Sequence, residues 1–434
     1  MSNVEIGLFG IVGVLVLLMI RTPIGIALGT AATVGVIAIR GWNAGLSILG
    51  AASFDFVAHW TLTAVPMFIL MGNFAFHSGL TSKLFTAARV WLSFLPGGLA
   101  LATVTSSAGF AAATGSSVAM AGAMSRLAIP EMLKAGYDRG LAAGSVAASG
   151  TLGALIPPSI PFILYAVFME SSVSQLLIAG IIPGLMTLFA YSALILIRVK
   201  LNPSLAPVQH DTHTLVEKLR LLGSAWPLPA IVLGVVGGLY SGIFTATEVG
   251  AGGAMLVLVF AVVTRTMSLT VFWRCIRETV TTTATIFLIA VGAVLFSQFL
   301  TLSRIPLEIG EVITVFSENR LLFILMVSAF YLVLGMFLDP IGLMLVTLPI
   351  LHPAITALDI DVIWFGVIVV KFVEIGLLTP PIGLNLYVVH AAVGNSMSFG
   401  EIVKGTSWFL IAEAVVMVCL FAFPSLALFL PSLM

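Results

Sequence analysis

Long apolar runs separated by short polar breaks fill the chain from end to end. Uncharged runs that exceed the ~20 residues needed to cross ~30 Å of hydrocarbon recur in both halves. They cover residues 90–125, 140–169, 171–197, 221–247, 279–303 and 375–400. The composition of the 434-residue chain, with 60% apolar and 8% charged residues, agrees with this pattern. The sequence therefore predicts an all-α polytopic membrane protein with no room for a soluble catalytic domain.

Two of these runs contain a double proline, Pro157 with Pro158 and, 223 residues later, Pro380 with Pro381. Because proline has no N–H, a helix through either pair would leave carbonyls of the preceding turn without donors. Such backbone is tolerated at membrane depth only where protein shields it or it lines a cavity. Paired broken helices at matching places in two halves are typical of the substrate and ion sites of secondary transporters. We therefore predict broken helices at about 140–170 and 362–393.

Two further apolar segments, about 99–128 and 321–355, are too long for one crossing and contain turn-prone residues in the middle. The interruptions are Thr-Gly-Ser-Ser at 114–117 and Asp-Pro-Ile-Gly at 339–342. Half-helices joined at such a tip can enter the bilayer and return as a re-entrant hairpin. Two full crossings joined by a short loop are the alternative, and we favour the hairpins.

One extended polar stretch divides the chain into halves that carry the same parts in the same order. If each hairpin makes no net crossing, the first half has an odd number of spans, which inverts the second half. With both termini outside, lysines and arginines gather mainly in the inner loops, as the positive-inside bias requires. The predicted organisation is a first repeat at 1–199, a polar cytoplasmic linker at 200–225 and an inverted second repeat at 226–434.

Each hairpin tip, together with the neighbouring broken helix, offers enough oxygen atoms to bind a sodium ion. Freed carbonyls and hydroxyls are suitable ligands, and small residues allow the two backbones to approach closely. The predicted ion ligands are Gly115, Ser116, Gly150, Thr151 and Gly153 in the first half and Gly335, Asp339, Gly342, Gly376, Thr379 and Gly383 in the second. The alternative is that these small residues only pack helices together.

The N-termini of the half-helices, which begin near residues 116, 159, 342 and 382, point partial positive charge toward the midplane. Such ends suit a carboxylate substrate. The predicted substrate-binding residues are Ser116, Ser117, Pro157, Pro158, Ser159, Thr379, Pro380 and Asn385.

Ionisable residues inside apolar runs usually have a partner or a function. Lys371 and Glu374 are three residues apart on one helical face, so an ion pair between them is favoured over a proton relay. Glu413 lies within the last span, and the sequence does not decide its role.

The sequence lacks the motifs of the common membrane enzymes. It contains no Gly-x-x-x-x-Gly-Lys-Ser/Thr phosphate loop and no His-Glu-x-x-His zinc motif. We therefore expect a protein that is not an enzyme and that needs no cofactor beyond Na⁺ as coupling ion. A proton-coupled carboxylate transporter and a passive channel are the alternatives.

Several motifs resemble the large membrane subunit of tripartite ATP-independent periplasmic (TRAP) transporters, the DctM-like family. The most specific is Glu-Ile-Gly-Leu-Leu-Thr-Pro-Pro-Ile-Gly-Leu-Asn at 374–385. Shorter matches lie at residues 21–25, 115–117, 149–153, 156–159, 179–184 and 244–248. The resemblance runs over the whole chain. Asp339 departs from the family pattern at the second tip, and it is also suited to cap the half-helix that follows.

The resemblance implies an elevator-type sodium symporter of the bacterial inner membrane, with both termini periplasmic. Its substrate would be a C4-dicarboxylate, sialic acid or a similar carboxylate, delivered by a periplasmic DctP-like binding protein. Family sodium sites lie at the hairpin tips and the adjacent broken helices. A small DctQ-like membrane subunit is expected as a separate chain, because Met1 directly precedes the first apolar span.

Overall fold

The computed structural model describes residues 2–207, 214–305 and 320–434, and it contains α-helices and short 3₁₀ helices with no strand among those residues. The all-α prediction is therefore confirmed. In the first half the helices are α1 (Asn3–Met19), α2 (Ile24–Arg40), α3 (Trp42–Val57), α4 (Ala64–His77), α5 (Leu80–Leu92), α6 (Gly98–Thr114), α7 (Ser117–Lys134), α8 (Arg139–Gly150), α9 (Ile160–Phe168), α10 (Val173–Ala179) and α11 (Ile181–Leu201). In the second half they are α12 (Leu215–Ala225), α13 (Pro227–Tyr240), α14 (Ala246–Val263), α15 (Leu269–Ser303), α17 (Arg320–Gly335), α18 (Pro340–Ala357), α19 (Val362–Leu378), α20 (Leu384–Val393), α21 (Phe399–Ala422) and α22 (Ser425–Leu428).

Helices that are long enough to cross a membrane occur in both halves. Five helices of the described residues are long and apolar enough to span a bilayer, or up to seven if two bent helix pairs each count as one span. One bent pair, residues 42–57 with 60–77, turns by 54°. The apolar residues of α3 continue into those of α4 with no acidic or basic residue between them except Asp55 and His59.

The predicted linker at 200–225 is partly helical. The structure places α11 up to Leu201 and α12 over Leu215–Ala225, and residues 208–213 lie outside the described part. Thr214 and Glu217 form a capping box at the start of α12, in which each side chain accepts a backbone N–H of the other residue. The polar residues that suggested a linker therefore also begin a helix.

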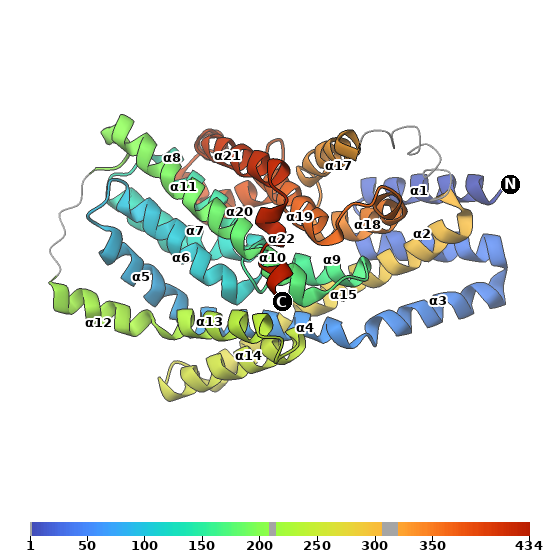
Figure 1. Cartoon of the computed structure of the whole chain (residues 1–434), viewed down its shortest axis with the longest axis horizontal. Coiled ribbons are helices and arrows are strands. Elements are labelled where there is room, and N and C mark those ends of the chain that lie inside the picture. The colour runs from blue at the N-terminus through green and yellow to red at the C-terminus, as the bar shows by residue number, and fades with distance from the viewer. Residues whose placement is uncertain (1, 208–213, 306–319) are drawn as a thin grey trace.

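Helix pairs α6–α7 and α17–α18 form the two hairpins, and pairs α8–α9 and α19–α20 form the two broken helices. The second arm of each hairpin packs against the second segment of the other half's broken helix: α7 contacts α20, and α18 contacts α9. Figure 1 shows α6–α8 on one side and α17 and α18 on the other, with α19 and α20 between them. The crossed packing joins the hairpins and broken helices of both halves into one body.

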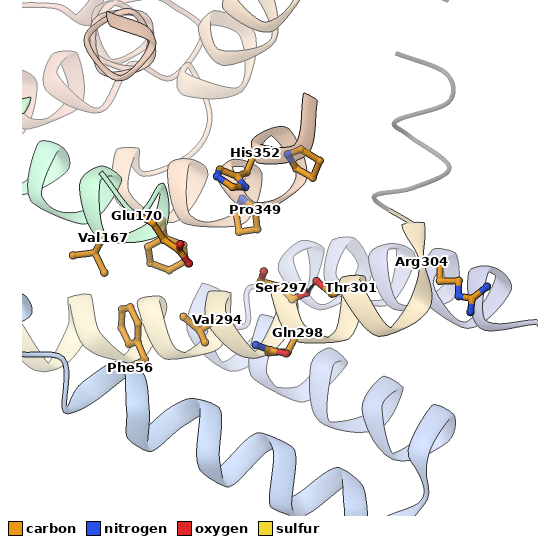
Figure 2. A pocket seen from close by; sticks show the side chains of 12 residues that line it. Phe56, Val167, Glu170, Val294, Ser297, Gln298, Thr301, Arg304, Pro349 and His352 are labelled. Atoms are coloured by element: carbon orange, nitrogen blue, oxygen red, sulfur yellow. Dashed lines mark hydrogen bonds between the residues drawn. The ribbon is translucent and has the colours of Figure 1, made fainter. Parts of the chain in front are cut away.

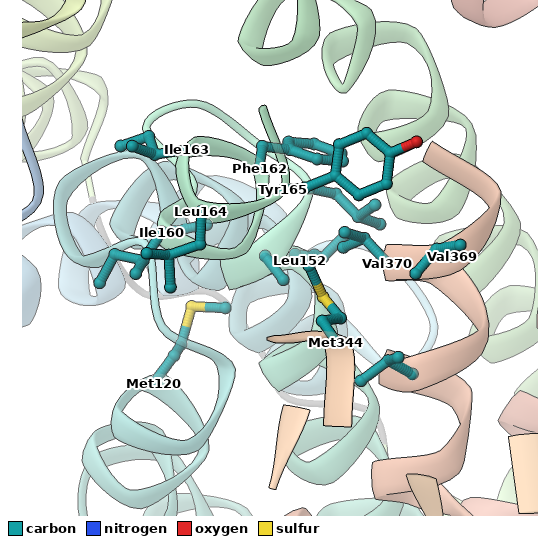
Figure 3. Close-up of a cluster of buried hydrophobic side chains, with 14 of the residues drawn as sticks. Met120, Leu152, Ile160, Phe162, Ile163, Leu164, Tyr165, Met344, Val369 and Val370 are labelled. Carbon is teal, nitrogen blue, oxygen red and sulfur yellow. The ribbon is translucent and has the colours of Figure 1, made fainter. Parts of the chain in front are cut away.

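Side chains from both halves share one buried cluster in this body. Met120 of α7 and Ile160 of α9 lie beside Met344 of α18 and Val369 of α19 (Figure 3). Apolar packing therefore contributes to holding the hairpins and broken helices together.

A second group of helices packs beside this body. The long helix α15 lies along α2 and also contacts α1, α3 and α4. Gly25 and Gly292 let α2 and α15 touch backbone to backbone, since a Cβ on either would clash with the other helix. We call α1–α4 and α13–α15 the outer group.

Candidate functional site

The first junction is the place where the α6–α7 tip meets the break between α8 and α9. Gly115 ends α6 in the left-handed region (φ 59°), and its carbonyl accepts the Ile160 N–H at 3.4 Å. Ser116 caps α7 by accepting the Ala119 N–H at 3.5 Å. A Cβ on Gly153 would lie 3.0 Å from the Ser116 carbonyl oxygen, so the tip and the broken helix are in backbone contact.

Within this junction, Ser159 closes part of the helix break. Its hydroxyl donates to the Ala154 carbonyl at 2.5 Å and accepts the Phe162 N–H at 3.3 Å, capping α9. The Ala154 carbonyl is one of those that the double proline leaves without a backbone donor. The Ser159 hydroxyl, five residues later, satisfies this carbonyl. The absence of proline N–H groups does not by itself predict that hydrogen bond.

The second junction is the place where the α17–α18 tip meets the break between α19 and α20. A Cβ on Gly376 would lie 2.6 Å from the Gly335 carbonyl carbon, and the Gly383 N–H donates to the Met336 carbonyl at 3.1 Å. Asp339 caps α18 by accepting the Gly342 N–H at 2.9 Å. The expectation that Asp339 can act as a cap is therefore confirmed.

The other predicted ligands of the second junction make local contacts. The Thr379 hydroxyl donates to the Ile375 carbonyl at 2.7 Å, and its N–H donates to the Gly376 carbonyl at 3.0 Å. The Cα of Gly342 faces Ile24 of α2, since a Cβ there would lie 2.9 Å from that side chain. Their roles as ion ligands stay predictions.

Asn385 connects the two halves. It begins the second segment of one broken helix, yet its amide donates at 3.5 Å to the Ala147 carbonyl of the other, and its Oδ1 has no partner among the described residues. Gly150 makes room for it, because a Cβ there would lie 2.9 Å from the Asn385 amide nitrogen.

A cavity of about 480 Å³ lies where the two tips face the outer group. It is lined by the first turns of α7, α9, α18 and α20, at Val118, Pro161, Ile341 and Leu384. Four helix N-termini, each of which favours negative charge, therefore converge on one space. The sequence predicted these ends but could not show that they meet.

The outer group contributes hydroxyls to the same cavity. Thr281, Thr282 and Thr285 of α15 and Asn73 of α4 line it opposite the tips. Sequence reasoning missed these residues, although the cluster of threonines at the start of an otherwise apolar run is a visible signal. The ionisable residues that line the cavity are Asp339 and Glu374, with no lysine or arginine among the described lining residues.

The predicted substrate residues do not all reach this cavity. Ser116 and Ser117 line it, whereas Pro157, Pro158, Ser159, Thr379, Pro380 and Asn385 lie outside its lining. The prolines and Ser159 form the breaks that aim the helix ends. They are therefore placed to shape the site rather than to line it.

A second cavity of about 510 Å³ lies farther along α15 (Figure 2). Ser297 and Thr301 of α15 face Pro349 and His352 of α18 across it. One helix therefore borders both the cavity at the tips and a polar opening beyond it.

A buried polar network lies behind the first junction. The Lys371 ammonium pairs with the Glu413 carboxylate and donates to the Thr187 hydroxyl at 3.0 Å. Glu413 also accepts the Tyr191 hydroxyl, whose oxygen lies 3.2 Å from the Thr151 hydroxyl. All five side chains are buried. The expected pair between Lys371 and Glu374 was wrong, because the tertiary fold brings a carboxylate from α21 to the lysine.

The comparisons with known proteins agree with this architecture. A family model described as "Tripartite ATP-independent periplasmic transporter, DctM component" matches residues 11–426. The chain is 36% identical over 383 residues to the C4-dicarboxylate TRAP transporter large permease protein DctM of Pseudomonas aeruginosa, covering 87% of this chain and 88% of that protein. It is 31% identical over 424 residues to the sialic acid TRAP transporter large permease protein SiaM of Vibrio cholerae, covering 98% of each.

Among solved structures, the fold is similar to the YdaH transporter of Alcanivorax borkumensis, with a TM-score of 0.61, 14% identity, and coverage of 88% of this chain and 90% of that one. This likeness concerns the fold alone. The family match over nearly the whole chain is what fixes the assignment. The chain is therefore a member of the DctM family, the large permease subunit of a tripartite ATP-independent periplasmic transporter.

Proposed function

We propose that this permease subunit couples inward sodium flow to the uptake of an organic acid. The observation that carries the proposal is the convergence of four half-helix N-termini on one cavity, which suits a carboxylate. The hairpin tips and helix breaks beside the cavity supply the carbonyl and hydroxyl oxygens that a sodium ion requires. A C4-dicarboxylate is the first substrate to test, followed by sialic acid.

The proposed motion is of the elevator type. The crossed packing of the hairpins with the broken helices makes one carrier body, and the outer group borders the cavity from the other side. The carrier would slide along α15 between the cavity at the tips and the polar cavity beyond it. Ion and substrate must both favour the same carrier state for the flows to be coupled.

The proposed setting is the bacterial inner membrane, with both termini periplasmic. A DctP-like binding protein would deliver the substrate, and a DctQ-like small membrane subunit would brace the outer group. The two halves would be inverted repeats, so that one tip gates each side of the site.

Reconstituted vesicles test the function directly. We expect uptake of radiolabelled succinate or sialic acid to require the binding protein and an inward Na⁺ gradient. Ser116→Ala and Thr379→Ala should both weaken the sodium dependence, because each removes a proposed ligand. Wild-type sodium dependence in both variants would contradict the assigned ion sites.

The same vesicles separate the alternatives. Uptake driven by a proton gradient in sodium-free buffer would favour a proton-coupled transporter. A flux that is not saturable and equilibrates without accumulation would favour a passive channel.

A further inference from the structure

Glu374 is a buried carboxylate that forms no ion pair with any described residue. It lies on α19 with 1% of its surface exposed, it lines the cavity at the tips, and its Oε2 has no hydrogen-bond partner. Lys371, one turn earlier on the same helix, directs its ammonium to Glu413 and Thr187 instead. The Lys371 ammonium is therefore directed toward another carboxylate and forms no ion pair with Glu374.

The remaining surroundings of Glu374 are polar or acidic. Ser117 of the first tip lines the same cavity, and besides Lys371 the charged groups that act on the Glu374 carboxylate are two further carboxylates, Asp339 and Glu413. An ionised carboxylate that is buried without a counter-charge is strongly unfavourable. Either a proton or a metal cation from the cavity can balance it, and the second carboxylate on the cavity wall, Asp339, favours a cation.

We propose that Glu374 holds a coupling sodium ion at the wall of the cavity, between its carboxylate and the Ser117 hydroxyl. This site rests on the proposed function and adds to the ion sites at the two junctions. The cavity of about 480 Å³ leaves room for water molecules to complete the coordination.

The proposed ion also explains how an acidic cavity accepts an anion. Without it, the Glu374 carboxylate repels a substrate carboxylate and competes with it for the four helix N-termini. With the ion bound, the helix ends become available to the substrate. Sodium therefore binds before the substrate, and each favours binding of the other.

The test is the sodium dependence of thermal stability, which requires no known substrate. The full chain, purified with its small subunit, is unfolded in increasing NaCl with KCl holding the ionic strength constant. A ligand that binds only the folded state raises the unfolding midpoint. For Glu374→Gln we expect a midpoint above wild type in KCl, because an unbalanced charge is removed. The Na⁺ concentration at half effect should rise about tenfold, because a charged ligand is lost.

Two further variants keep the result interpretable. Asp361→Asn changes the N-cap at the other end of the same helix, where the carboxylate accepts the Trp364 N–H at 2.8 Å. It should lower the midpoint in both salts and leave the Na⁺ dependence unchanged. Glu374→Asp retains the charge and should give a half effect between those of wild type and Glu374→Gln. If Glu374→Gln does not fold, Glu374→Asp and Ser117→Ala carry the test, and both should need more Na⁺.

Three results would overturn the site. A wild-type Na⁺ response in Glu374→Gln would remove the ion from Glu374 and leave sodium coupling at the junctions intact. A variant that loses only a pH dependence of stability, with the Na⁺ response unchanged, would show that a proton balances the carboxylate. Absence of any sodium-specific effect in the wild-type protein would end the sodium proposal as a whole.

Discussion

At each of the two junctions a hairpin tip meets a helix break through the same kind of backbone hydrogen bond. The two breaks differ in how deeply they are buried. In both, a backbone N–H after the double proline donates to a carbonyl of the tip, from Ile160 to Gly115 and from Gly383 to Met336. At the first junction Pro157 and Pro158 are buried, whereas Pro380 and Pro381 at the second are exposed. The shared plan therefore lies in the backbone, and the difference lies in what surrounds it.

Buried hydroxyls fix the break at the first junction, whereas the closest contact at the second is between two glycines. The hydroxyls of Thr151 and Ser159 tie the first break to Tyr191 and to the Ala154 carbonyl. At the second, Gly335 and Gly376 touch directly. One broken-helix motif can therefore be stabilised either by polar side chains or by close backbone packing. We expect the two junctions to be sensitive to different substitutions.

The largest effect is expected behind the first junction. Lys371→Met should destabilise the protein by about 3–5 kcal/mol, because it leaves the Glu413 carboxylate buried without its counter-charge. The double variant Lys371→Met/Glu413→Leu should recover most of this loss. Arg139→Met, which removes the more exposed pair with Glu401 (3.5 Å), is the control and should cost far less. Denaturant unfolding measures all three, and equal losses for Lys371→Met and Arg139→Met would contradict the assignment.

The second junction should be the more sensitive to an added methyl group. Gly376→Ala should destabilise by about 1–3 kcal/mol, because the new Cβ would lie 2.6 Å from rigid backbone at Gly335. Gly153→Ala should cost less, since its nearest neighbour would lie at 3.0 Å. Gly252→Ala, with nothing within 4 Å, is the matched control. Thermal unfolding of the three variants ranks them, and the reverse order would refute the comparison.

Loss of the Ser159 hydroxyl tests whether side chains close the first break. Ser159→Ala should cost about 1–2 kcal/mol, because it removes the cap of α9 and leaves the Ala154 carbonyl without its donor. Ser172→Ala removes the exposed cap of α10, which accepts the Gln175 N–H at 3.3 Å, and should cost less. Urea unfolding compares them. If the two costs are equal, burial of the first break adds nothing to the cap.

The smallest expected effect concerns ion binding at the first junction. Tyr191→Phe removes the hydroxyl beside Thr151 and should raise the Na⁺ concentration for half-maximal thermal stabilisation severalfold, consistent with a loss of about 1 kcal/mol. Tyr165→Phe removes a hydroxyl that donates to the Val362 carbonyl at 2.8 Å, away from Thr151. It should leave the Na⁺ concentration for half-maximal stabilisation unchanged. A matching shift in both variants would indicate a general loss of stability.

Local sequence signals were sufficient to place the breaks in the helices. The double prolines, the Gly-Ser tip and the Asp-Pro tip act within a few residues, through missing donors, permissive glycines and side-chain caps. The structure accordingly ends α6 at Thr114 and α19 at Leu378, beside these signals. Membrane character and family also followed from local patterns, because hydropathy and motifs need no tertiary information.

Tertiary structure alone decided which of these pieces meet. Lys371 takes its partner from α21 rather than from Glu374 one turn away, and Asn385 reaches the Ala147 carbonyl in the other half. The cavity likewise collects four helix ends, two from each half of the chain, at Val118, Pro161, Ile341 and Leu384. A buried charge pairs with whichever group the packing brings near, and that packing depends on contacts between distant segments that no local pattern encodes.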